Sequence, residues 1–284
     1  MIFRADLHCH TTCSDGSLSP KEIIDHAAEK GLRGLSITDH DTIGAFDIAV
    51  ERAREKNILL LPGIEFSTSY KDVSIHVLGY AFDVHSESLL VHCQKLLEER
   101  CRRNSRVLGL LRKKGLIVHE EELLSMAGIE GEEVPTALGR LHIAQLLLKK
   151  GYVHSVQEAF NKYIGDERSC YEVGSRQSVE EAIVKIQKGG GKAILAHPHL
   201  IQRKKILQDL LKMNFDGLEV YYARFSREKE QKWLDIARQK QWIVTGGSDF
   251  HGLTKPHIGL GCSWVSEEIF MKLYDNFLIV NGKG

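Results

Sequence analysis

The sequence predicts an α/β fold, in which parallel strands alternate with crossover helices and one all-helical segment interrupts the series. Short β-rich runs recur along the 284 residues, and most are followed by a helical pattern, which is the order typical of a parallel sheet. Between residues 87 and 166 the strands stop and helical periodicity continues alone. Several runs end in His, Asp or Glu, and the ends of parallel strands in an α/β barrel share one rim.

Seven runs have the composition of strands. Each is rich in β-branched or other apolar residues and ends in polar residues. The predicted strands are Ile2–Leu7, Gly34–Thr38, Leu59–Glu65, Ser74–Tyr80, Lys192–Ala196, Gly217–Tyr221 and Trp242–Gly247. Helical patterns between most of them supply the crossovers that parallel strands require.

The first predicted helix has the clearest boundaries. Ser19 is placed to cap it, Pro20 suits its first position, and Gly31 ends it. Apolar residues at helical spacing predict further crossover helices over Ala45–Lys56, Val179–Lys188 and Phe225–Lys240.

The all-helical segment contains four stretches of helical periodicity, near residues 87–114, 119–127, 136–150 and 155–163. No internal repeat and no low-complexity linker separates it from its neighbours. We therefore expect a barrel domain formed by residues 1–99 and 169–284, with residues 100–168 as a helical cap built into it.

The overall charge is balanced, since Lys plus Arg and Asp plus Glu each total 38. The molecule as a whole therefore offers no long-range field that would attract nucleic acid or an anionic membrane, and a polyanionic substrate must be held locally. The first residues lack the pattern of a targeting segment, and no later run approaches 18 apolar residues. We expect a cytoplasmic protein with no membrane association and no obligate protein partner.

Histidine and carboxylate residues gather at the ends of five predicted strands. His8 and His10 end the first, His40 follows the second, Glu65 ends the third, His197 follows the fifth, and Asp249 and His251 follow the seventh. Because side chains on extended backbone alternate with period two, both members of the His-x-His and Asp-x-His pairs face the same side. Residues far apart in the sequence are thus expected to converge on one pocket.

Imidazole and carboxylate groups together are typical ligands of zinc, manganese or iron. These seven groups, or nine with Asp15 and His76, exceed the three or four ligands of one catalytic zinc, so we expect two or three divalent ions. Closely spaced ions can share a bridging hydroxide and bind phosphate oxygens, which is the chemistry of phosphoester hydrolysis. For any single histidine the alternative is a hydrogen-bonded structural role.

These motifs, together with Asp15 and His76, resemble the PHP superfamily, named for its polymerase and histidinol-phosphatase members. The residues that carry the resemblance are His8-Cys9-His10, Asp15-Gly16-Ser17, Thr38-Asp39-His40-Asp41, Glu65, His76, His197-Pro198 and Asp249-Phe250-His251. The resemblance covers nearly the whole chain. It implies a distorted (βα)7 TIM-like barrel with an all-helical insert domain, which agrees with the seven predicted strands.

The resemblance also implies how nine ligands divide among the ions. One ion would be held by His8, His10, Glu65 and Asp249. Glu65 would bridge to a second ion, held also by His76 and His197, and a third ion would use Asp15, His40 and His251. His76 is assigned by the resemblance, because Ser74–Tyr80 also has the pattern of an ordinary strand with one polar residue. We expect manganese first, with zinc, iron(II) or magnesium as alternatives that ligand spacing does not distinguish.

Within the superfamily, the helical insert resembles that of stand-alone members that act on 3′,5′-nucleoside bisphosphates and on RNA or DNA from the 5′ end. The similar stretches are residues 135–142, residues 146–152 and Ala159-Phe160. The resemblance implies that Arg140 and His142 are catalytic and substrate-binding residues that hold phosphate over the metals. Arg140 can do so through two parallel hydrogen bonds, and its alternative is a solvated helix residue.

Two further features are candidate substrate contacts. Tyr221, Tyr222 and Arg224, at the end of the sixth predicted strand, could bind a base or a phosphate, or could pack at the barrel lip. Seven basic residues without an intervening acid could guide a nucleic acid backbone, or could form a solvated helix face: Arg100, Arg102, Arg103, Arg106, Arg112, Lys113 and Lys114.

The predicted reaction is hydrolysis of a phosphoester by a metal-bridging hydroxide, with Arg140 fixing the phosphate. Two substrates fit one geometry: a 3′,5′-nucleoside bisphosphate that loses its 3′-phosphate, and a 5′-phosphorylated oligonucleotide that is cut at its first linkage. In both, the reacting phosphorus belongs to the 3′-phosphate of a 5′-phosphorylated nucleotide. The alternatives are a small-metabolite phosphatase of the histidinol-phosphate type and a metal-binding module without catalysis.

Overall fold

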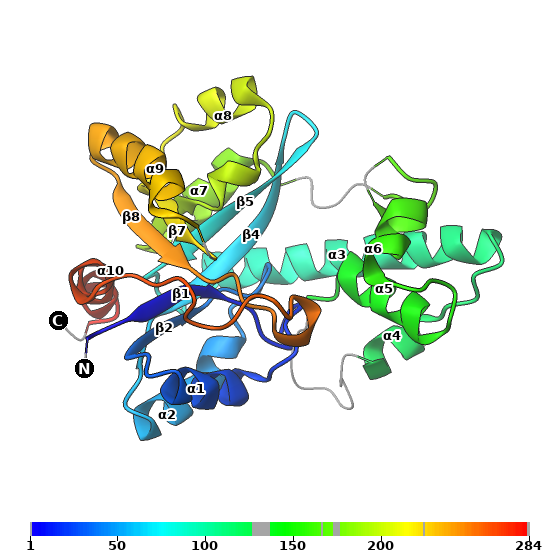
Figure 1. Cartoon of the computed structure of the whole chain (residues 1–284), viewed down its shortest axis with the longest axis horizontal. Coiled ribbons are helices and arrows are strands. Elements are labelled where there is room, and N and C mark those ends of the chain that lie inside the picture. The colour runs from blue at the N-terminus through cyan, green and yellow to red at the C-terminus, as the bar shows by residue number, and fades with distance from the viewer. Residues whose placement is uncertain (1, 127–136, 166, 173–176, 224, 283–284) are drawn as a thin grey trace.

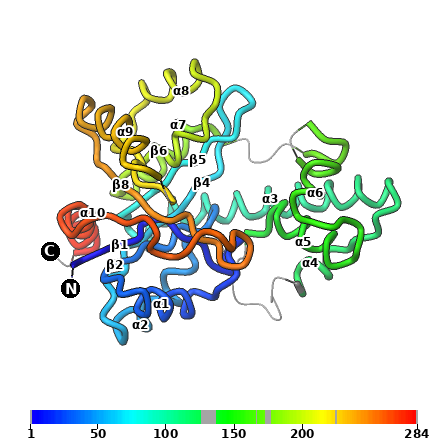
Figure 2. The backbone as a smooth tube through the Cα atoms, in the orientation of Figure 1, coloured from blue at the N-terminus to red at the C-terminus, as the bar shows by residue number. Residues whose placement is uncertain are grey.

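The computed structural model describes residues 2–126, 137–165, 167–172, 177–223 and 225–282. The chain has a mixed α/β fold (Figure 1). Strands and most helices lie in one part of the molecule, and a group of helices extends from it, as the backbone trace in Figure 2 also shows. None of the described helices is both long enough and apolar enough to cross a membrane.

The strands form two sheets within the described residues. The first sheet is parallel and contains β1 (Ala5–Cys9), β2 (Gly34–Ile37) and β3 (Leu59–Leu60). The second has the order β4 (Gly63–Tyr70), β5 (Val73–Tyr80), β6 (Lys192–Leu195), β7 (Gly217–Tyr222) and β8 (Ile243–Gly247). In it, β5 is antiparallel to both neighbours, whereas β6, β7 and β8 are parallel.

Two predictions about the sheet are wrong. The third predicted strand, Leu59–Glu65, divides into β3 and β4, so the described chain has eight strands rather than seven. Pro62 lies at the division, where it lacks an N–H group to donate to a neighbouring strand. The prediction that all strands are parallel fails at β5, because Lys71 and Asp72, with φ of 49° and 61°, form a two-residue hairpin turn between β4 and β5.

The two sheets meet at two seams, which we define by their isolated bridges: Cys9 with Phe250, and His40 with Glu65. At the first seam the His10 N–H donates to the Phe250 carbonyl at 2.9 Å. At the second, the Asp41 N–H donates to the Glu65 carbonyl at 3.1 Å. Candidate metal ligands therefore lie on both seams.

Helices cover the sheets (Figure 1). They are α1 (Pro20–Glu29), α2 (Ala45–Glu55), α7 (Val179–Lys188), α8 (Lys204–Leu210), α9 (Arg227–Lys240) and α10 (Glu267–Val280), with short 3₁₀ turns η2 (Pro198–Leu200) and η3 (Gly252–Thr254). The predicted start of α1 is confirmed, because the Ser19 hydroxyl accepts the Glu22 N–H while the Glu22 carboxylate accepts the Ser19 N–H.

The helical part contains α3 (Glu87–Lys113), α4 (Glu120–Met126), α5 (Arg140–Lys149), α6 (Val156–Ala159) and the π-helical turn η1 (Phe160–Ile164). The first turns of α3 pack in the core of the second sheet through Leu89 and Leu96. Its later turns join a separate core with α5, in which Val107 and Leu111 lie with Ile143. One continuous helix therefore connects the two cores.

Candidate metal centre

The nine predicted ligands lie close together. His8 and His10 come from the end of β1, Asp15 from the loop that follows it, His40 from the end of β2, Glu65 from β4, His76 from β5, His197 from the end of β6, and Asp249 and His251 from the segment after β8. His8, His10 and Glu65 are almost fully buried. The convergence confirms the expectation that ends of distant strands meet at one pocket.

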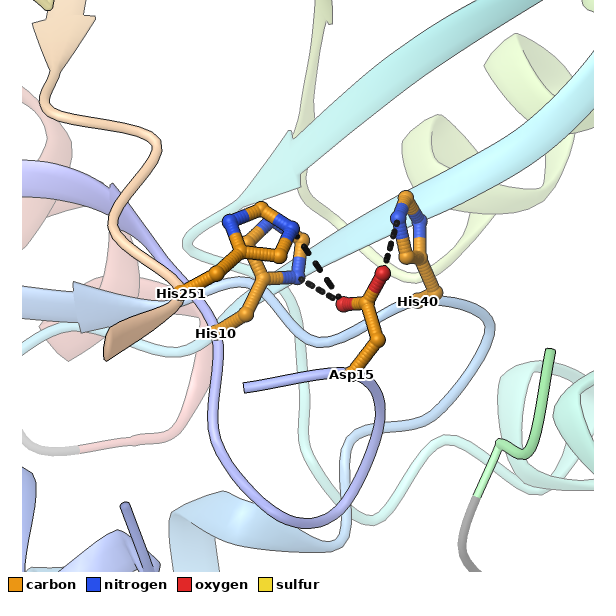
Figure 3. A group of neighbouring side chains, drawn as sticks. All are labelled: His10, Asp15, His40 and His251. Carbon is orange, nitrogen blue, oxygen red and sulfur yellow. Dashed lines mark ion pairs between the residues drawn. The ribbon is translucent and has the colours of Figure 1, made fainter. Parts of the chain in front are cut away.

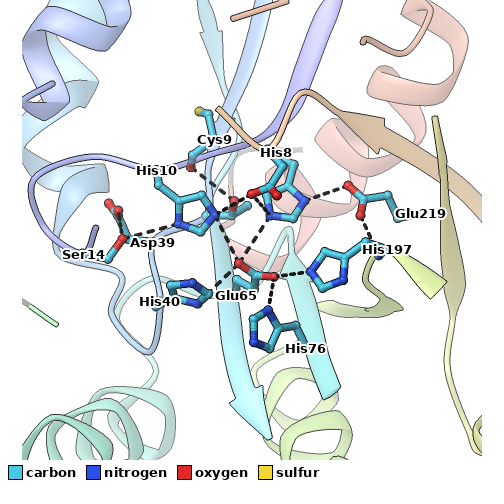
Figure 4. Close-up of polar contacts among 12 residues, drawn as sticks. His8, Cys9, His10, Ser14, Asp39, His40, Glu65, His76, His197 and Glu219 are labelled. Atoms are coloured by element: carbon cyan, nitrogen blue, oxygen red, sulfur yellow. Dashed lines mark hydrogen bonds and ion pairs between the residues drawn. The ribbon is translucent and has the colours of Figure 1, made fainter. Parts of the chain in front are cut away.

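Glu65 lies at the centre of the cluster (Figure 4). Its Oε1 atom is 2.8 Å from His76 Nδ1 and 2.9 Å from His197 Nε2. The other oxygen, Oε2, lies 3.1 Å from His10 Nε2 and 3.4 Å from both His8 Nε2 and His40 Nδ1. The two oxygens thus face different groups of imidazoles, which is the arrangement that a carboxylate bridging two cations requires.

Asp15 joins a second group of imidazoles (Figure 3). Its Oδ1 atom lies 3.3 Å from His251 Nε2 and 3.5 Å from His10 Nδ1, and Oδ2 lies 3.8 Å from His40 Nε2. One candidate ligand atom from each of these four residues lies within 4.8 Å of the others. Two further such groups are His8 with His10 and Asp249, and His40 with Glu65 and His76.

Asp249 is held from two sides. Its Oδ1 atom lies 3.4 to 3.5 Å from nitrogens of His8, His10 and His251. Its Oδ2 atom accepts hydrogen bonds from the Tyr222 hydroxyl at 2.6 Å and from Lys255 Nζ at 2.7 Å. The backbone of Asp249 has a φ of 55°, and strained conformations of this kind are common at functional sites.

Three imidazole nitrogens test whether the cluster fits a cation. His8 Nε2, His10 Nε2 and His40 Nδ1 are buried and have no hydrogen-bond partner among the residues that the structure describes. Carboxylate oxygens lie within 3.1 to 3.4 Å of each of them, but not in hydrogen-bonding geometry. Buried polar atoms are normally paired, so nitrogens directed at carboxylates without bonding them fit a cation between the two.

The electrostatics of the cluster agree with this fit. Burial alone would raise the pKa of Asp15, Glu65 and Asp249, yet the surrounding imidazoles, joined at Asp249 by Lys255, hold the pKa of each well below its usual range. Burial would lower the pKa of His10, but the neighbouring carboxylates of Asp249 and Glu65 raise it to about 9. The carboxylates are therefore charged at neutral pH, and a cation would have to displace a proton from the His10 imidazole.

Sequence reasoning missed Glu219, a buried carboxylate within β7. Its Oε1 atom lies 2.7 Å from His8 Nδ1, and Oε2 accepts the His197 backbone N–H at 2.7 Å (Figure 4). A carboxylate on the outer nitrogen of an imidazole fixes which nitrogen is left for a cation. A signal was present, because an acidic residue inside the apolar run Gly217–Tyr221 requires a partner once it is buried.

A cavity of about 730 Å³ adjoins the cluster. Its lining includes the candidate ligands Asp15, His40 and His76 and, from the helical part, Arg140. His142 is buried but not part of the lining, and its Nδ1 atom accepts the Gly139 N–H at 3.1 Å.

The remaining predicted contacts are placed differently. Tyr221 is half-buried and packs against the hydrophobic core, whereas the next residue, Tyr222, bonds Asp249. Arg224 lies outside the described residues, as do Pro135 and Thr136 of the motif before α5.

Comparisons with known proteins agree with this architecture. The family model of the PHP domain matches residues 6–174. A 5′-3′ exoribonuclease from Haemophilus influenzae is 32% identical over 99% of this chain and 98% of its own length. A 3′,5′-nucleoside bisphosphate phosphatase from Chromobacterium violaceum is 29% identical over 87% of this chain and 86% of its own.

Among solved structures, a candidate metal-dependent phosphoesterase from Bifidobacterium adolescentis superposes with a TM-score of 0.86 at 30% identity, covering 96% of both chains. The matched PHP model spans more than half of the chain, and the exoribonuclease aligns along nearly all of it. On these grounds, the chain belongs to the PHP domain family.

Proposed function

We propose that this protein is a metal-dependent phosphoesterase that hydrolyses the 3′-phosphate of 5′-phosphorylated nucleotides. Its substrates would be 3′,5′-nucleoside bisphosphates, oligonucleotides of RNA or DNA trimmed from the 5′ end, or both. Relatives named for these two activities support the proposal. The observation that carries it is the cluster around Glu65, in which three buried imidazole nitrogens lie beside carboxylates without bonding them.

The residues proposed to hold two or three divalent ions are His8, His10, Asp15, His40, Glu65, His76, His197, Asp249 and His251. When bound, such ions supply a water that ionises near neutral pH and positive charge for the phosphate oxygens. Imidazole and carboxylate suit manganese, zinc and iron(II) alike, so the ligands do not rank these ions. Manganese is the first ion that we would test. Tyr222 and Lys255 would keep Asp249 oriented through its outer oxygen.

Arg140 would position the substrate. It lines the same cavity as Asp15, His40 and His76, so a phosphate could contact the cluster and this guanidinium together. Fixing the phosphate in this way turns the attack of water into an effectively intramolecular step. The bisphosphate and the oligonucleotide then differ only in the group that leaves the 3′-phosphate.

We also propose a domain division that matches this function. Residues 1–99 and 169–284 would form a distorted (βα)7 barrel, and residues 100–168 an all-helical cap over the site. The separate core of Val107, Leu111 and Ile143 supports two units. Because α3 passes through residues 99 and 100 without a break, the cap would be rigidly attached to the barrel.

One comparison of substrates tests the proposal. Phosphate release from adenosine 3′,5′-bisphosphate, histidinol phosphate and a simple monophosphate would be measured with each metal in turn, beside mononucleotide release from a 5′-phosphorylated oligonucleotide. We expect the two 5′-phosphorylated nucleotide substrates to be preferred. A preference for histidinol phosphate would refute the substrate class, and unchanged activity of Asp249→Ala in metal-replete protein would refute the metal mechanism.

A further inference from the structure

Three aromatic side chains form a group of their own beside the candidate metal centre. His199 lies in η2 after β6, Tyr222 ends β7, and Phe225 precedes α9. The His199 ring centroid is 4.4 Å from that of Tyr222 and 4.3 Å from that of Phe225. The Tyr222 and Phe225 centroids are 5.6 Å apart, and all three side chains are half-buried. These three residues are named the aromatic platform below.

The platform is separate from the hydrophobic core. Tyr222 and Phe225 belong to none of the four hydrophobic clusters formed by the described residues, whereas the adjacent Tyr221 packs against two of them. The ring of Phe225 instead contacts the other two platform rings and the Lys229 ammonium, which lies 5.3 Å from its centroid. Core packing therefore does not account for an aromatic residue at position 225.

The platform is joined directly to the candidate metal centre. The Tyr222 hydroxyl donates to Asp249 Oδ2 at 2.6 Å, and the Tyr222 ring centroid lies 5.9 Å from that of His197. The His199 ring lies 6.5 Å from that of His197, whose Nε2 atom is 2.9 Å from Glu65 Oε1. A group attached to a phosphate at the metal centre is therefore within reach of the platform.

The platform and the 730 Å³ cavity adjoin different ligands of the metal centre. The cavity lining includes Asp15, His40 and His76 and no platform residue. The platform contacts His197 and Asp249, neither of which lines the cavity. In Figures 1 and 2, α9, which follows the platform, lies across the sheets from the helical part that contributes to the cavity. A reacting phosphate at the metal centre thus has one binding surface on each side.

We propose that the aromatic platform binds the base of the second nucleotide of an oligonucleotide substrate, the one joined to the reacting phosphate through its 5′ oxygen. Aromatic side chains stack on bases of any sequence, because every base has a π-face. Lys229, exposed beside Phe225, would contact the phosphate that follows. A nucleoside bisphosphate has no second base, so the platform favours oligonucleotides. This inference rests on the proposed function and selects between its two substrate classes.

Two dinucleotide substrates isolate the contribution of the second base. One is 5′-phosphorylated adenylyl-adenosine, and the other has the same phosphates and sugars but lacks the second base. The ratio of their kcat/KM values is the measured quantity, because the first nucleotide and the reacting phosphate are identical. We expect a ratio of roughly 5 to 150 in the wild type, which is the effect of stacking one base on an aromatic side chain.

Three variants separate stacking from packing. Phe225→Leu keeps an apolar side chain but removes the ring, whereas Phe225→Tyr keeps the ring. Phe3→Leu is the matched control, because Phe3 is also half-buried and pairs with Phe270 at 5.5 Å, at the other end of β1 from the metal centre. We expect the ratio to fall at least fivefold in Phe225→Leu and to stay within twofold of the wild type in Phe225→Tyr and Phe3→Leu. An unchanged ratio in Phe225→Leu, or an equal fall in Phe225→Tyr, would overturn the proposal.

Fluorescence tests the platform without turnover. The probe is a 5′-phosphorylated dinucleotide with 2-aminopurine as its second base and a non-hydrolysable phosphonate linkage, added to the metal-loaded protein. We expect quenching by the wild type and by Phe225→Tyr, and at least twofold less quenching at saturation by Phe225→Leu. Equal quenching by all three would overturn the proposal. If the wild type cleaves neither dinucleotide nor adenosine 3′,5′-bisphosphate, the proposed function fails, while the quenching still decides the role of the platform.

Discussion

Glu219 holds two candidate metal ligands at once, and Glu219→Gln should weaken metal binding without removing any ligand. The carboxylate takes part in two short contacts, with His8 Nδ1 and with the His197 N–H, both at 2.7 Å. A glutamine amide has one oxygen and one NH2 group, so it can accept only one of these bonds. At the other contact, the glutamine NH2 group would face a second hydrogen-bond donor, either the His197 N–H or a protonated His8 Nδ1.

Either orientation of the glutamine has a defined consequence. If its NH2 faces His8, Nδ1 must become the acceptor, the proton moves to Nε2, and Nε2 can no longer bind a cation. If its oxygen faces His8, the His197 N–H loses its acceptor in a buried site, which costs about 1–3 kcal/mol. Loss of such a supporting hydrogen bond weakens metal affinity by roughly 10- to 100-fold, or about 1.4–2.7 kcal/mol.

The assay is calorimetric titration of chelator-treated protein with Mn²⁺. Glu268→Gln is the matched control, because Glu268 is an exposed residue of α10 that pairs with Lys272 at 2.9 Å. We expect Glu219→Gln to bind Mn²⁺ at least tenfold more weakly than Glu268→Gln. Equal affinities in two folded variants would refute the idea that the carboxylate orients His8.

Three other predictions follow from the described contacts. Tyr222→Phe removes the 2.6 Å hydrogen bond to Asp249 and should lower kcat about 10- to 100-fold, measured at saturating Mn²⁺; wild-type kcat would contradict it. Burial, and then His197, lower the pKa of His199 from 6.5 to about 4. Between these two pH values the unfolded state binds more protons than the folded state, so the stability of the protein falls as the pH falls. His199→Gln should therefore gain stability relative to the wild type between pH 7 and 5 in urea titrations of metal-free protein, and a constant difference would count against this. Gly247→Ala would bring a Cβ atom 2.3 Å from His8 N and should destabilise by about 1–3 kcal/mol. Gly109→Ala, inside α3, would place its Cβ atom no closer than 3.9 Å to Arg112 Nη2 and should stabilise by roughly 0.5–1 kcal/mol in the same assay.

Much of the candidate site could be predicted because side chains on extended backbone alternate with period two, so residues two positions apart face the same side. The pairs His8 with His10 and Asp249 with His251 are separated by one residue, and the structure brings them to the same cluster. His76 was harder, because it lies within β5 rather than at its end and no local spacing marks it. Its approach to Glu65 depends on the antiparallel pairing of β4 with β5, which side-chain alternation does not encode.

Helix boundaries could be predicted where the signals are local in the sequence. The direction of a strand was harder to predict, because it depends on which strands pair. Ser19 and Pro20 mark the start of α1, and the structure confirms both. By contrast, the alternation of apolar residues is the same in parallel and antiparallel strands, so the direction of β5 could not be read from it. The burial of Arg103 was also beyond reach, since a run of seven basic residues does not reveal which of them face inward.

The seams between the two sheets have a consequence for how the protein unfolds. His8, His10, Asp15 and His40 come from the first sheet and its loops, whereas Glu65, His76, His197, Asp249 and His251 come from the second or from the segment after β8. An ion shared between these sets would add a cross-link between two sheets that already share the backbone bridges at Cys9 and His40 and the hydrogen bond from the Tyr80 hydroxyl to the Leu7 carbonyl. A cation present at a hundred times its Kd adds about 2.7 kcal/mol to folding stability. That stabilisation would act across the seams, so chelation should speed amide hydrogen exchange most at the backbone groups beside them, such as the N–H groups of His10 and Asp41.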